Sequence, residues 1–341
     1  MEDPCLKLSV IIPYYNADKW IGKMLDSLLD QDISPDTYEI IVVDDGSTQG
    51  VDTLKDYTDR YPNIHYFRQE NSGPSAARNN GLGIARGKWI YFCDSDDFIH
   101  PQVLGFLLKT VEDQDLEMLV CDWCYVGPDD VPLDQERPFE LSGVYTGIDY
   151  IASFADNPMS IGFGLWRFLV KKSVIEENGI RFEDLAYIED RLFQMELLTV
   201  VERLVHARFI LYYYVQHKPS ILNSKGSRYD RYAPWIWHYI ERLTDSMHDG
   251  PLSTNPDPCR TLKGWRDYAI FSLLVNSFKY CPVSTSKKYL KELEGIEDAF
   301  PIKNYGNKAI QSVCKCMEHP HLWMFLCRIF HLVPLKIRQS L

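Results

Sequence analysis

A short acidic cluster is the part of this sequence best suited to chemistry. The apolar run Lys88–Asp94 has the pattern of a strand, and it delivers Asp94, Asp96 and Asp97 at its carboxyl end. Clustered carboxylates repel one another, so they persist most easily where a cation lies among them. Mg²⁺ prefers oxygen ligands and often binds through one or two carboxylates together with substrate phosphates. The cluster therefore indicates a divalent cation site, although a solvated acidic turn would contain the same residues.

The elements that must position this cluster alternate along the N-terminal part of the chain. Short β-branched runs predict strands, and segments with helical periodicity predict helices between them. The strands are expected at Leu6–Pro13, Glu39–Asp45, Ile64–Gln69 and Lys88–Asp94, and the helices at Trp20–Leu29, Val51–Tyr61, Ser75–Ala85 and Pro101–Val111. This alternation predicts an α/β fold with a mixed, mostly parallel sheet flanked by helices.

Polar or acidic side chains follow all four predicted strands. They lie in Pro13–Asn16, Asp44–Ser47, Glu70–Gly73 and Asp94–Asp97. Ligands of a parallel sheet bind beyond the carboxyl ends of its strands, so these four segments are expected to form one site. A purely structural protein would not need polar or acidic residues after every one of these strands.

The rest of the chain has a less regular pattern. Leu165–Ile175 predicts a strand that runs into a helix, and Tyr187–Thr199 predicts a loop followed by a helix. Arg208–His217 predicts a further strand, and the pattern becomes mostly helical after about residue 226. We therefore expect one domain over residues 1–225, which contains the predicted site, and a helical region over residues 226–341.

Composition limits the class of protein and its compartment. The 341 residues are 45% hydrophobic and carry a formal net charge of −12, which argues against nucleic-acid binding as the main role. Nine cysteines without regular spacing favour a reducing cytoplasm. Cys121 and Cys124 form a C-x-x-C pair, which is half of a zinc site, a redox motif, or two buried or idle thiols. The first residues lack a secretory signal.

The C-terminal segment Leu322–Arg338 differs in composition from the rest of the chain. It is apolar and aromatic, with Arg328, Lys336 and Arg338 interleaved. It is too short to span a bilayer but is suited to lie in a membrane interface. The alternative is a terminal helix packed against the protein itself. The expected location is thus cytoplasmic, with peripheral contact at the inner membrane face as an option.

Five motifs in sequence order carry a resemblance to a known family. SVIIPYYN, EIIVVDDGST, NSGPSAARNNGL, YFCDSDD and IEDRLF resemble the motifs of family 2 glycosyltransferases with the GT-A fold. The resemblance covers about residues 6–220. It implies a nucleotide-diphospho-sugar donor, usually a UDP-sugar, with Mg²⁺ or Mn²⁺ as cofactor. It also implies inverting transfer to a hydroxyl of a glycan or lipid-linked glycan acceptor.

The resemblance assigns one group of residues to the nucleotide. Pro13 and Tyr14 are expected beside the base, and Asp44 and Asp45 beside the base and ribose. Asp and Gly also favour turns and helix caps, which is the structural alternative for the aspartates. Arg78 lies one turn inside a helix whose N-terminus favours anions. The resemblance implies that Arg78 lines the nucleotide pocket, on the base or phosphate side, and a surface arginine is the alternative.

A second group is assigned to the diphosphate and the cation. By resemblance, Asp94 contacts the ribose and shares the metal ion with Asp96, and Ser95 lies between them in the nucleotide site. Asp97 is expected to orient this pair. His217 follows a strand at a point where the family often has a basic or polar loop that closes over the phosphates.

The catalytic base is expected in the motif IEDRLF. Glu189 and Asp190 match the acidic pair of the family, and Asp190 is at the position of the base. A carboxylate in the first turn of a helix also has a structural explanation, because it offsets the helix dipole. Trp166 is expected either to stack on the acceptor sugar or to pack in the core.

Other classes fit the sequence less well. A sugar nucleotidyltransferase needs a glycine-rich loop after its first strand, where this chain has PYYNADKW, and a dinucleotide-binding oxidoreductase needs G-x-G-x-x-G. A partner subunit that binds sugar nucleotides without catalysis remains an alternative, against which stands the presence of every expected carboxylate.

Overall fold

A computed structural model of the chain describes residues 6–127, 132, 139–185, 187–216, 229–281, 283–296 and 298–299. His217 and the segment 322–338 lie outside these residues. The chain forms two compact units, Met1–Gly147 with Phe163–His217 and Ile148–Gly162 with Lys218–Leu341. No helix of the described residues is long and apolar enough to cross a membrane.

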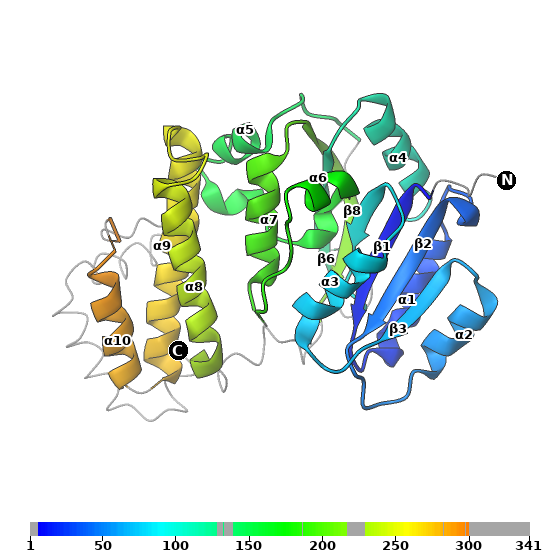
Figure 1. The fold of residues 1–341 in the computed structure, drawn as a ribbon, viewed down its shortest axis with the longest axis horizontal. Coiled ribbons are helices and arrows are strands. Elements are labelled where there is room, and N and C mark those ends of the chain that lie inside the picture. The colour runs from blue at the N-terminus through cyan, green and yellow to red at the C-terminus, as the bar shows by residue number, and fades with distance from the viewer. Residues whose placement is uncertain are drawn as a thin grey trace. The chain divides into compact units, whose positions relative to one another are not determined.

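The first unit is built around an eight-stranded sheet in the order β3-β2-β1-β4-β7-β6-β8-β5 (Figure 1). The strands are β1 Leu8–Tyr14, β2 Tyr38–Asp44, β3 Ile64–Arg68, β4 Trp89–Phe92, β5 Phe98–Ile99, β6 Met118–Val126, β7 Phe168–Lys171 and β8 Leu204–Val215. Strands β3, β2, β1 and β4 are parallel, and β6 is parallel to β8. Strand β7 is antiparallel to β4 and β6, and β5 is antiparallel to β8. The predicted mixed, mostly parallel sheet is confirmed.

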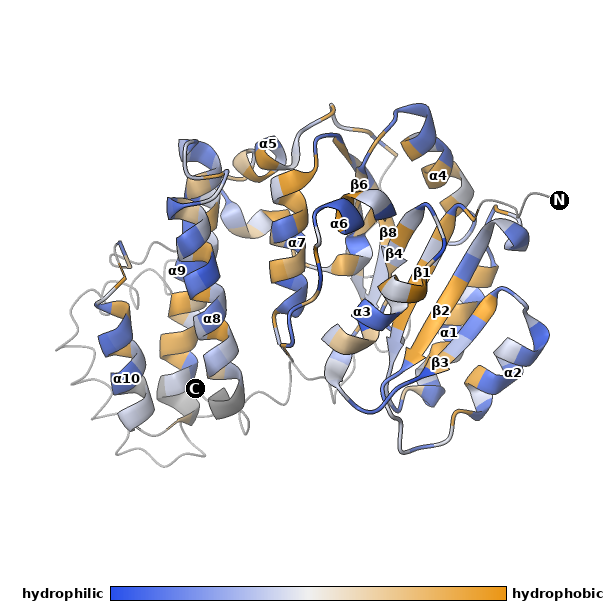
Figure 2. Ribbon diagram, viewed as in Figure 1, coloured by the Kyte–Doolittle hydropathy of each residue, from blue (hydrophilic) through white to orange (hydrophobic). Residues whose placement is uncertain are grey.

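Helices cover both faces of this sheet. They are α1 Asp18–Leu29, α2 Asp52–Arg60, α3 Gly73–Ile84, α4 Leu104–Asp113, α6 Lys172–Glu177 and α7 Glu189–Val200, with short 3₁₀ turns η1 Pro35–Thr37 and η3 Leu165–Arg167. Ile12 and Ile40 share a buried cluster with residues of α1 and α4. On the other face α3 approaches β1 so closely that a Cβ on Gly81 would clash with Ile11. Figure 2 shows apolar residues along β1 and β2, as strands buried on both faces require.

Helix α4 begins later than its sequence pattern predicts. The expected start was Pro101, but the helix begins at Leu104. The side chain of Gln31 accepts hydrogen bonds from the backbone N–H groups of Val103 and Leu104, both at 3.0 Å. These bonds satisfy donors that a helix N-terminus leaves open, so a distant loop fixes where α4 starts.

The second unit is helical in its described residues. It contains α5 Gly147–Ala152, whose first residue belongs to the other unit, η2 Pro158–Ile161, α8 Tyr229–His248, α9 Pro256–Tyr280 and α10 Val283–Leu293. Thr261 on α9 donates a hydrogen bond to Ile151 O, and the indole of Trp265 donates one to Pro158 O, both at 2.8 Å. The segment 148–162, which the sequence did not separate from the catalytic region, is therefore packed on α9.

Candidate active site

The acidic cluster lies directly after β4, and a relay of hydrogen bonds attaches it to β8. The backbone N–H of Asp94 donates to the hydroxyl of Tyr212 at 3.1 Å. That hydroxyl donates to Asp97 at 2.7 Å, and the N–H of Val215 donates to the other oxygen of Asp97, also at 2.7 Å. Asp97 thus holds the acidic turn against the end of β8.

The three carboxylates of the cluster have different surroundings. Asp97 is only 1% exposed, and its burial raises its pKa well above the usual range, with further increases from Asp96 and Asp94. The side chain of Asp94 is 33% exposed, and Asp96 is also partly exposed. The outer two carboxylates are therefore accessible to a ligand, and the inner one holds the turn.

Arg78 on α3 connects the acidic cluster to the candidate base helix. Its guanidinium donates to Asp94 at 3.0 Å and to Glu189 at 2.8 Å. Burial opposes the charge of Arg78, but Asp94 and Glu189 together raise its pKa. The ring of Phe182 lies 5.6 Å from the guanidinium carbon. A buried, permanently charged arginine thus links two of the predicted site residues.

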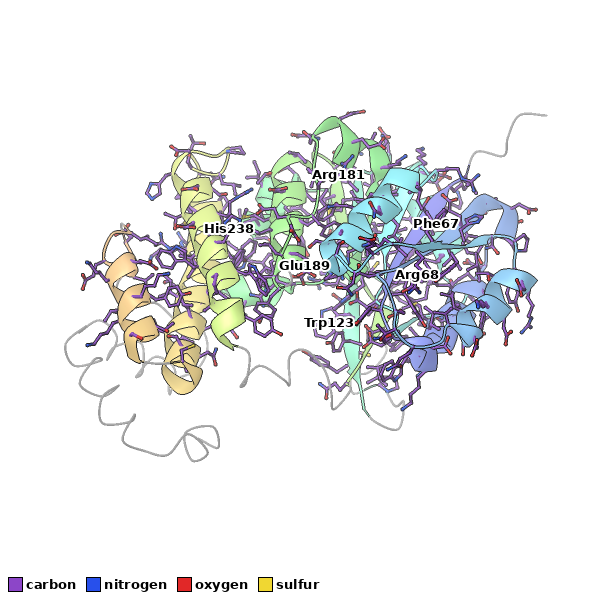
Figure 3. All side chains as sticks on the ribbon, turned by 60° about the horizontal axis from the view of Figure 1, so that its bottom comes forward. Phe67, Arg68, Trp123, Arg181, Glu189 and His238 are labelled. Atoms are coloured by element: carbon purple, nitrogen blue, oxygen red, sulfur yellow. The ribbon has the colours of Figure 1, made fainter. Side chains whose placement is uncertain are left out.

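Glu189 and Asp190 lie in the first turn of α7, as predicted (Figure 3 labels Glu189). Burial raises the pKa of Glu189, Arg78 opposes this rise, and Asp190 adds to it. The residue before the pair, Ile188, has a left-handed backbone with φ of 66°. Such a conformation is strained for a β-branched residue, and strain of this kind is found at functional sites. The sequence pattern did not indicate it.

Two more residues of α3 hold the segment that leads into α7, and the sequence analysis missed both. The amide of Asn79 donates to Phe182 O at 2.8 Å and accepts from Phe182 N at 2.9 Å. The hydroxyl of Ser75 donates to Leu185 O at 2.8 Å. Ser75, Arg78 and Asn79 are spaced i, i+3 and i+4, so they share one face of α3. The spacing in the sequence indicates this shared face, but it does not identify the residues that the face contacts.

Asp44, at the end of β2, is fully buried, and its carboxylate is occupied within the chain. It accepts from the N–H of Ser47 at 2.8 Å, and from the hydroxyl of Tyr66 and the guanidinium of Arg68 at 2.7 Å each. Burial acts to raise the pKa of Asp44, but the bonds from Ser47 and Tyr66 and the charge of Arg68 outweigh it and lower the pKa. Asp44 therefore organises the loop as an anion.

Asp45 organises the start of α3 in a similar way. Its carboxylate accepts from the amide of Gln69 and from the backbone N–H groups of Ser72 and Gly73, at 2.7 to 2.8 Å. Gly46, which follows it, has φ of +74°, and a Cβ there would lie 2.8 Å from a backbone nitrogen. The motif Asp-Asp-Gly-Ser thus forms a turn at the end of β2, and hydrogen bonds connect this turn to the end of β3 and the start of α3.

The aromatic residues of the candidate site are divided between core and surface. The ring of Tyr14 is buried, and the ring that solvent reaches at the end of β1 is Tyr15, which is 50% exposed. Pro13 is partly buried on β1, and Ser95 is partly exposed between the two outer aspartates. Trp166 packs in the core, which was one of its two expected roles.

The carboxylates present are suited to a hard cation that a ligand helps to hold. No group of three His, Cys, Asp or Glu side chains among the described residues forms a ready-made metal cage. Mg²⁺ retains water and commonly takes one or two carboxylates plus phosphate oxygens, which Asp94 and Asp96 could supply with a bound diphosphate. Cys121 and Cys124 are buried, and neither forms a disulfide or a zinc site with other described residues.

Comparisons with known proteins identify the family and the fold. The profile of the family Glycosyl transferase family 2 matches residues 9–174. YibD, a glycosyltransferase of Escherichia coli K12, is 31% identical over 260 residues, which are 71% of this chain and 72% of YibD. The poly(ribitol-phosphate) β-N-acetylglucosaminyltransferase TarP of Staphylococcus aureus N315 is 26% identical over 269 residues, 76% of this chain and 77% of TarP. The fold is similar to that of S. aureus TarS 1–349 in complex with UDP-GlcNAc, with a TM-score of 0.67, 19% identity and coverage of 96% of this chain and 92% of that one.

Proposed function

The chain belongs to glycosyltransferase family 2, and we propose that it transfers a sugar from a nucleoside-diphosphate sugar to an acceptor hydroxyl with inversion, assisted by Mg²⁺ or Mn²⁺. The observation that supports this most is the pair of ionic contacts made by Arg78. They bring an accessible carboxylate of the acidic cluster and the acidic pair of α7 into one site.

Asp94 and Asp96 are the residues that would hold the cation together with the donor diphosphate. When bound, such an ion neutralises the charge that grows on the departing nucleoside diphosphate. Arg78 contributes a fixed positive charge at the same place. The buried Asp97 holds the turn, so that the outer two carboxylates do not need to be ordered by the ligand.

Asp190 is the proposed general base. It takes the proton of the acceptor hydroxyl while that oxygen forms a bond to the anomeric carbon. The bond between this carbon and the diphosphate breaks on the opposite face, and its electron pair leaves with the nucleoside diphosphate. Glu189 is engaged by Arg78 at 2.8 Å, which leaves the partly exposed Asp190 as the better placed carboxylate of the pair.

A UDP-sugar is the proposed donor and a glycan or lipid-linked glycan the proposed acceptor. TarP is named as an N-acetylglucosaminyltransferase, and TarS 1–349 was solved with UDP-GlcNAc. Residues 1–225 are the proposed catalytic part, with His217 over the phosphates, and residues 226–341 the proposed acceptor or membrane contact. The basic and aromatic pattern of 322–338 supports peripheral binding to an anionic membrane.

The function is tested with UDP-GlcNAc and Mn²⁺. We expect the wild-type chain to hydrolyse or transfer the sugar slowly, and UDP to raise its melting temperature only when Mn²⁺ is present. Asp96→Ala should abolish turnover and the Mn²⁺-dependent part of this shift while the fold survives. Asp36→Ala, which removes an exposed carboxylate at η1, is the control.

Two results would contradict the proposal. Full activity in EDTA, or in Asp96→Ala, would show that the reaction does not need the cation. The lack of turnover with any sugar nucleotide, together with retained UDP binding, would instead identify a binding subunit without catalysis.

A further inference from the structure

An aromatic surface at the ends of β6 and β8 has no role in the mechanism above. The register of these strands shifts between Cys121 and Trp123, and beyond the shift Trp123 pairs with Tyr212 and Tyr125 with Tyr214. Because side chains two residues apart on a strand share a face, these four rings lie on one face of the sheet. Bulges of this kind redirect side chains and are common beside active sites.

The rings form an inner and an outer layer. In the inner layer Trp166 stacks on Tyr212, with centroids 4.6 Å apart and planes 10° from parallel. Both rings are buried. Trp123 covers this pair, with its ring edge-on to Trp166 at 5.1 Å (Figure 3 labels Trp123). The buried rings of Trp166 and Tyr212 are therefore part of the core.

The outer layer consists of Trp123, Tyr125 and Tyr214. The ring of Tyr125 is edge-on to Trp123 at 4.6 Å and to Tyr214 at 5.6 Å. Tyr125 is 44% exposed, and the other two rings are partly exposed. Three rings in edge-on contact that remain open to solvent are more than core packing requires.

This outer layer is continuous with the candidate active site. Val215, the neighbour of Tyr214 on β8, donates its N–H to Asp97. Tyr212, the cross-strand partner of Trp123, donates its hydroxyl to the same carboxylate. The charges of Asp97 and Asp94 also act on the hydroxyl of Tyr214, in addition to its burial, and raise its pKa. The rings thus border the acidic cluster on the side away from β1, β2 and β3, whose ends carry the nucleotide motifs.

We propose that Trp123, Tyr125 and Tyr214 form a subsite for a neutral pyranose ring of the acceptor. This inference rests on the proposed function and specifies its acceptor. A pyranose has faces of C–H bonds that bury apolar area against aromatic rings, while its hydroxyls point outward to water and to carboxylates. A linear polyol phosphate, the acceptor type in the name of TarP, has no such face.

Binding of small acceptor fragments tests the subsite. The full-length chain, saturated with UDP and Mn²⁺, is titrated with methyl β-D-glucopyranoside, methyl N-acetyl-β-D-glucosaminide and ribitol 5-phosphate, and binding is followed by saturation-transfer NMR. We expect the two pyranosides to bind through their ring C–H protons and ribitol 5-phosphate to give no signal. Tyr125→Ala should weaken pyranoside binding about tenfold, which corresponds to one lost aromatic contact of this kind.

The control is Phe106→Ala, which removes an equally exposed ring from α4. Phe106→Ala should leave pyranoside binding unchanged. Tyr125→Ala should keep its affinity for UDP within about twofold, because the proposed subsite does not contact the nucleotide. The inference is overturned if the wild-type chain binds no pyranoside, if ribitol 5-phosphate binds and Tyr125→Ala abolishes it, or if both variants behave alike. Turnover of a panel of sugar nucleotides by the wild-type chain is measured separately, so that a lack of turnover with all of them rejects the proposed function even where the pyranosides bind.

Discussion

The hydroxyl of Tyr212 donates a 2.7 Å hydrogen bond to the buried carboxylate of Asp97. The same hydroxyl accepts the backbone N–H of Asp94, which lies 118 residues away in the sequence. The position of the acidic turn therefore depends on a side chain of β8. Because Asp97 is buried, the loss of this donor would leave one oxygen of its carboxylate without this hydrogen bond, which costs more than the loss of an exposed bond.

Tyr212→Phe tests this relationship. The substitution keeps the ring that stacks on Trp166 and removes the hydroxyl. We expect the free energy of unfolding to fall by about 1–3 kcal/mol, the cost of an unsatisfied buried group. The Mn²⁺-dependent melting shift with UDP should also decrease. Tyr268→Phe, which removes an exposed hydroxyl from α9, should change neither quantity. Equal shifts in the two variants would show that the relay does not position the turn.

Asp190→Asn tests the assignment of the general base. The amide keeps the shape of the side chain but cannot take the proton of an acceptor hydroxyl. Because general bases contribute about 10²- to 10⁴-fold, kcat should fall by that factor while UDP affinity stays nearly normal. If transfer remains within a few-fold of wild type, Glu189→Gln is the next variant, and a large loss there would move the role to Glu189.

Asn79→Ala tests whether α3 positions the base helix. The change removes both bonds to the backbone of Phe182, at the start of the segment that leads to Glu189. Because small displacements of a catalytic group are costly, kcat should fall by about tenfold or more while the KM for the donor changes little. Asn178→Ala, which removes an amide bonded to the backbone of α6 at Val174, is the matched control. A change in donor KM with unchanged kcat would contradict a positioning role.

The sequence predicted the strand ends well because the evidence for them is local. Four short apolar runs end in polar residues, and each predicted strand is present in the sheet. The same reasoning did not find the bonds from Asn79 to Phe182 or from Tyr212 to Asp97. Both join residues that are more than a hundred positions apart, and no periodicity within one element encodes such a pairing.

Two further features of the site also depend on tertiary contacts that the sequence pattern does not show. The sequence places Asp44 and Tyr14 at strand ends but does not show their burial. The loop after β2 encloses Asp44, and Tyr14 packs in the core beneath β1. Ile188 takes a left-handed conformation that propensity disfavours for a β-branched residue. The surrounding packing imposes it, which is why a pattern of residue types could not predict it.

Glu39 offers a test of stability against pH at a place away from the acidic cluster. Its side chain, 3% exposed on β2, accepts a hydrogen bond from Ser9 at 2.7 Å and bonds from the backbone and guanidinium of Arg86 at 2.7 to 3.0 Å. Burial acts to raise the pKa of Glu39, but the bonds from Ser9 and Arg86 outweigh it and lower the pKa below its usual value.

A carboxyl whose pKa is lower in the folded than in the unfolded chain stabilises the fold above its unfolded pKa, about 4.3 for Glu. This contribution is lost as the pH falls through the lower, folded pKa. Glu39→Gln should therefore reduce the free energy of unfolding by about 1–3 kcal/mol at pH 7, because charged bonds to a buried group are replaced by weaker ones. The difference from wild type should shrink below about pH 4 as the wild-type carboxyl becomes protonated. Urea unfolding at a series of pH values measures both curves, with Glu70→Gln, an exposed carboxyl after β3, as the control. A difference that stays constant down to pH 3 would show that the change acts through packing and not through the charge of Glu39.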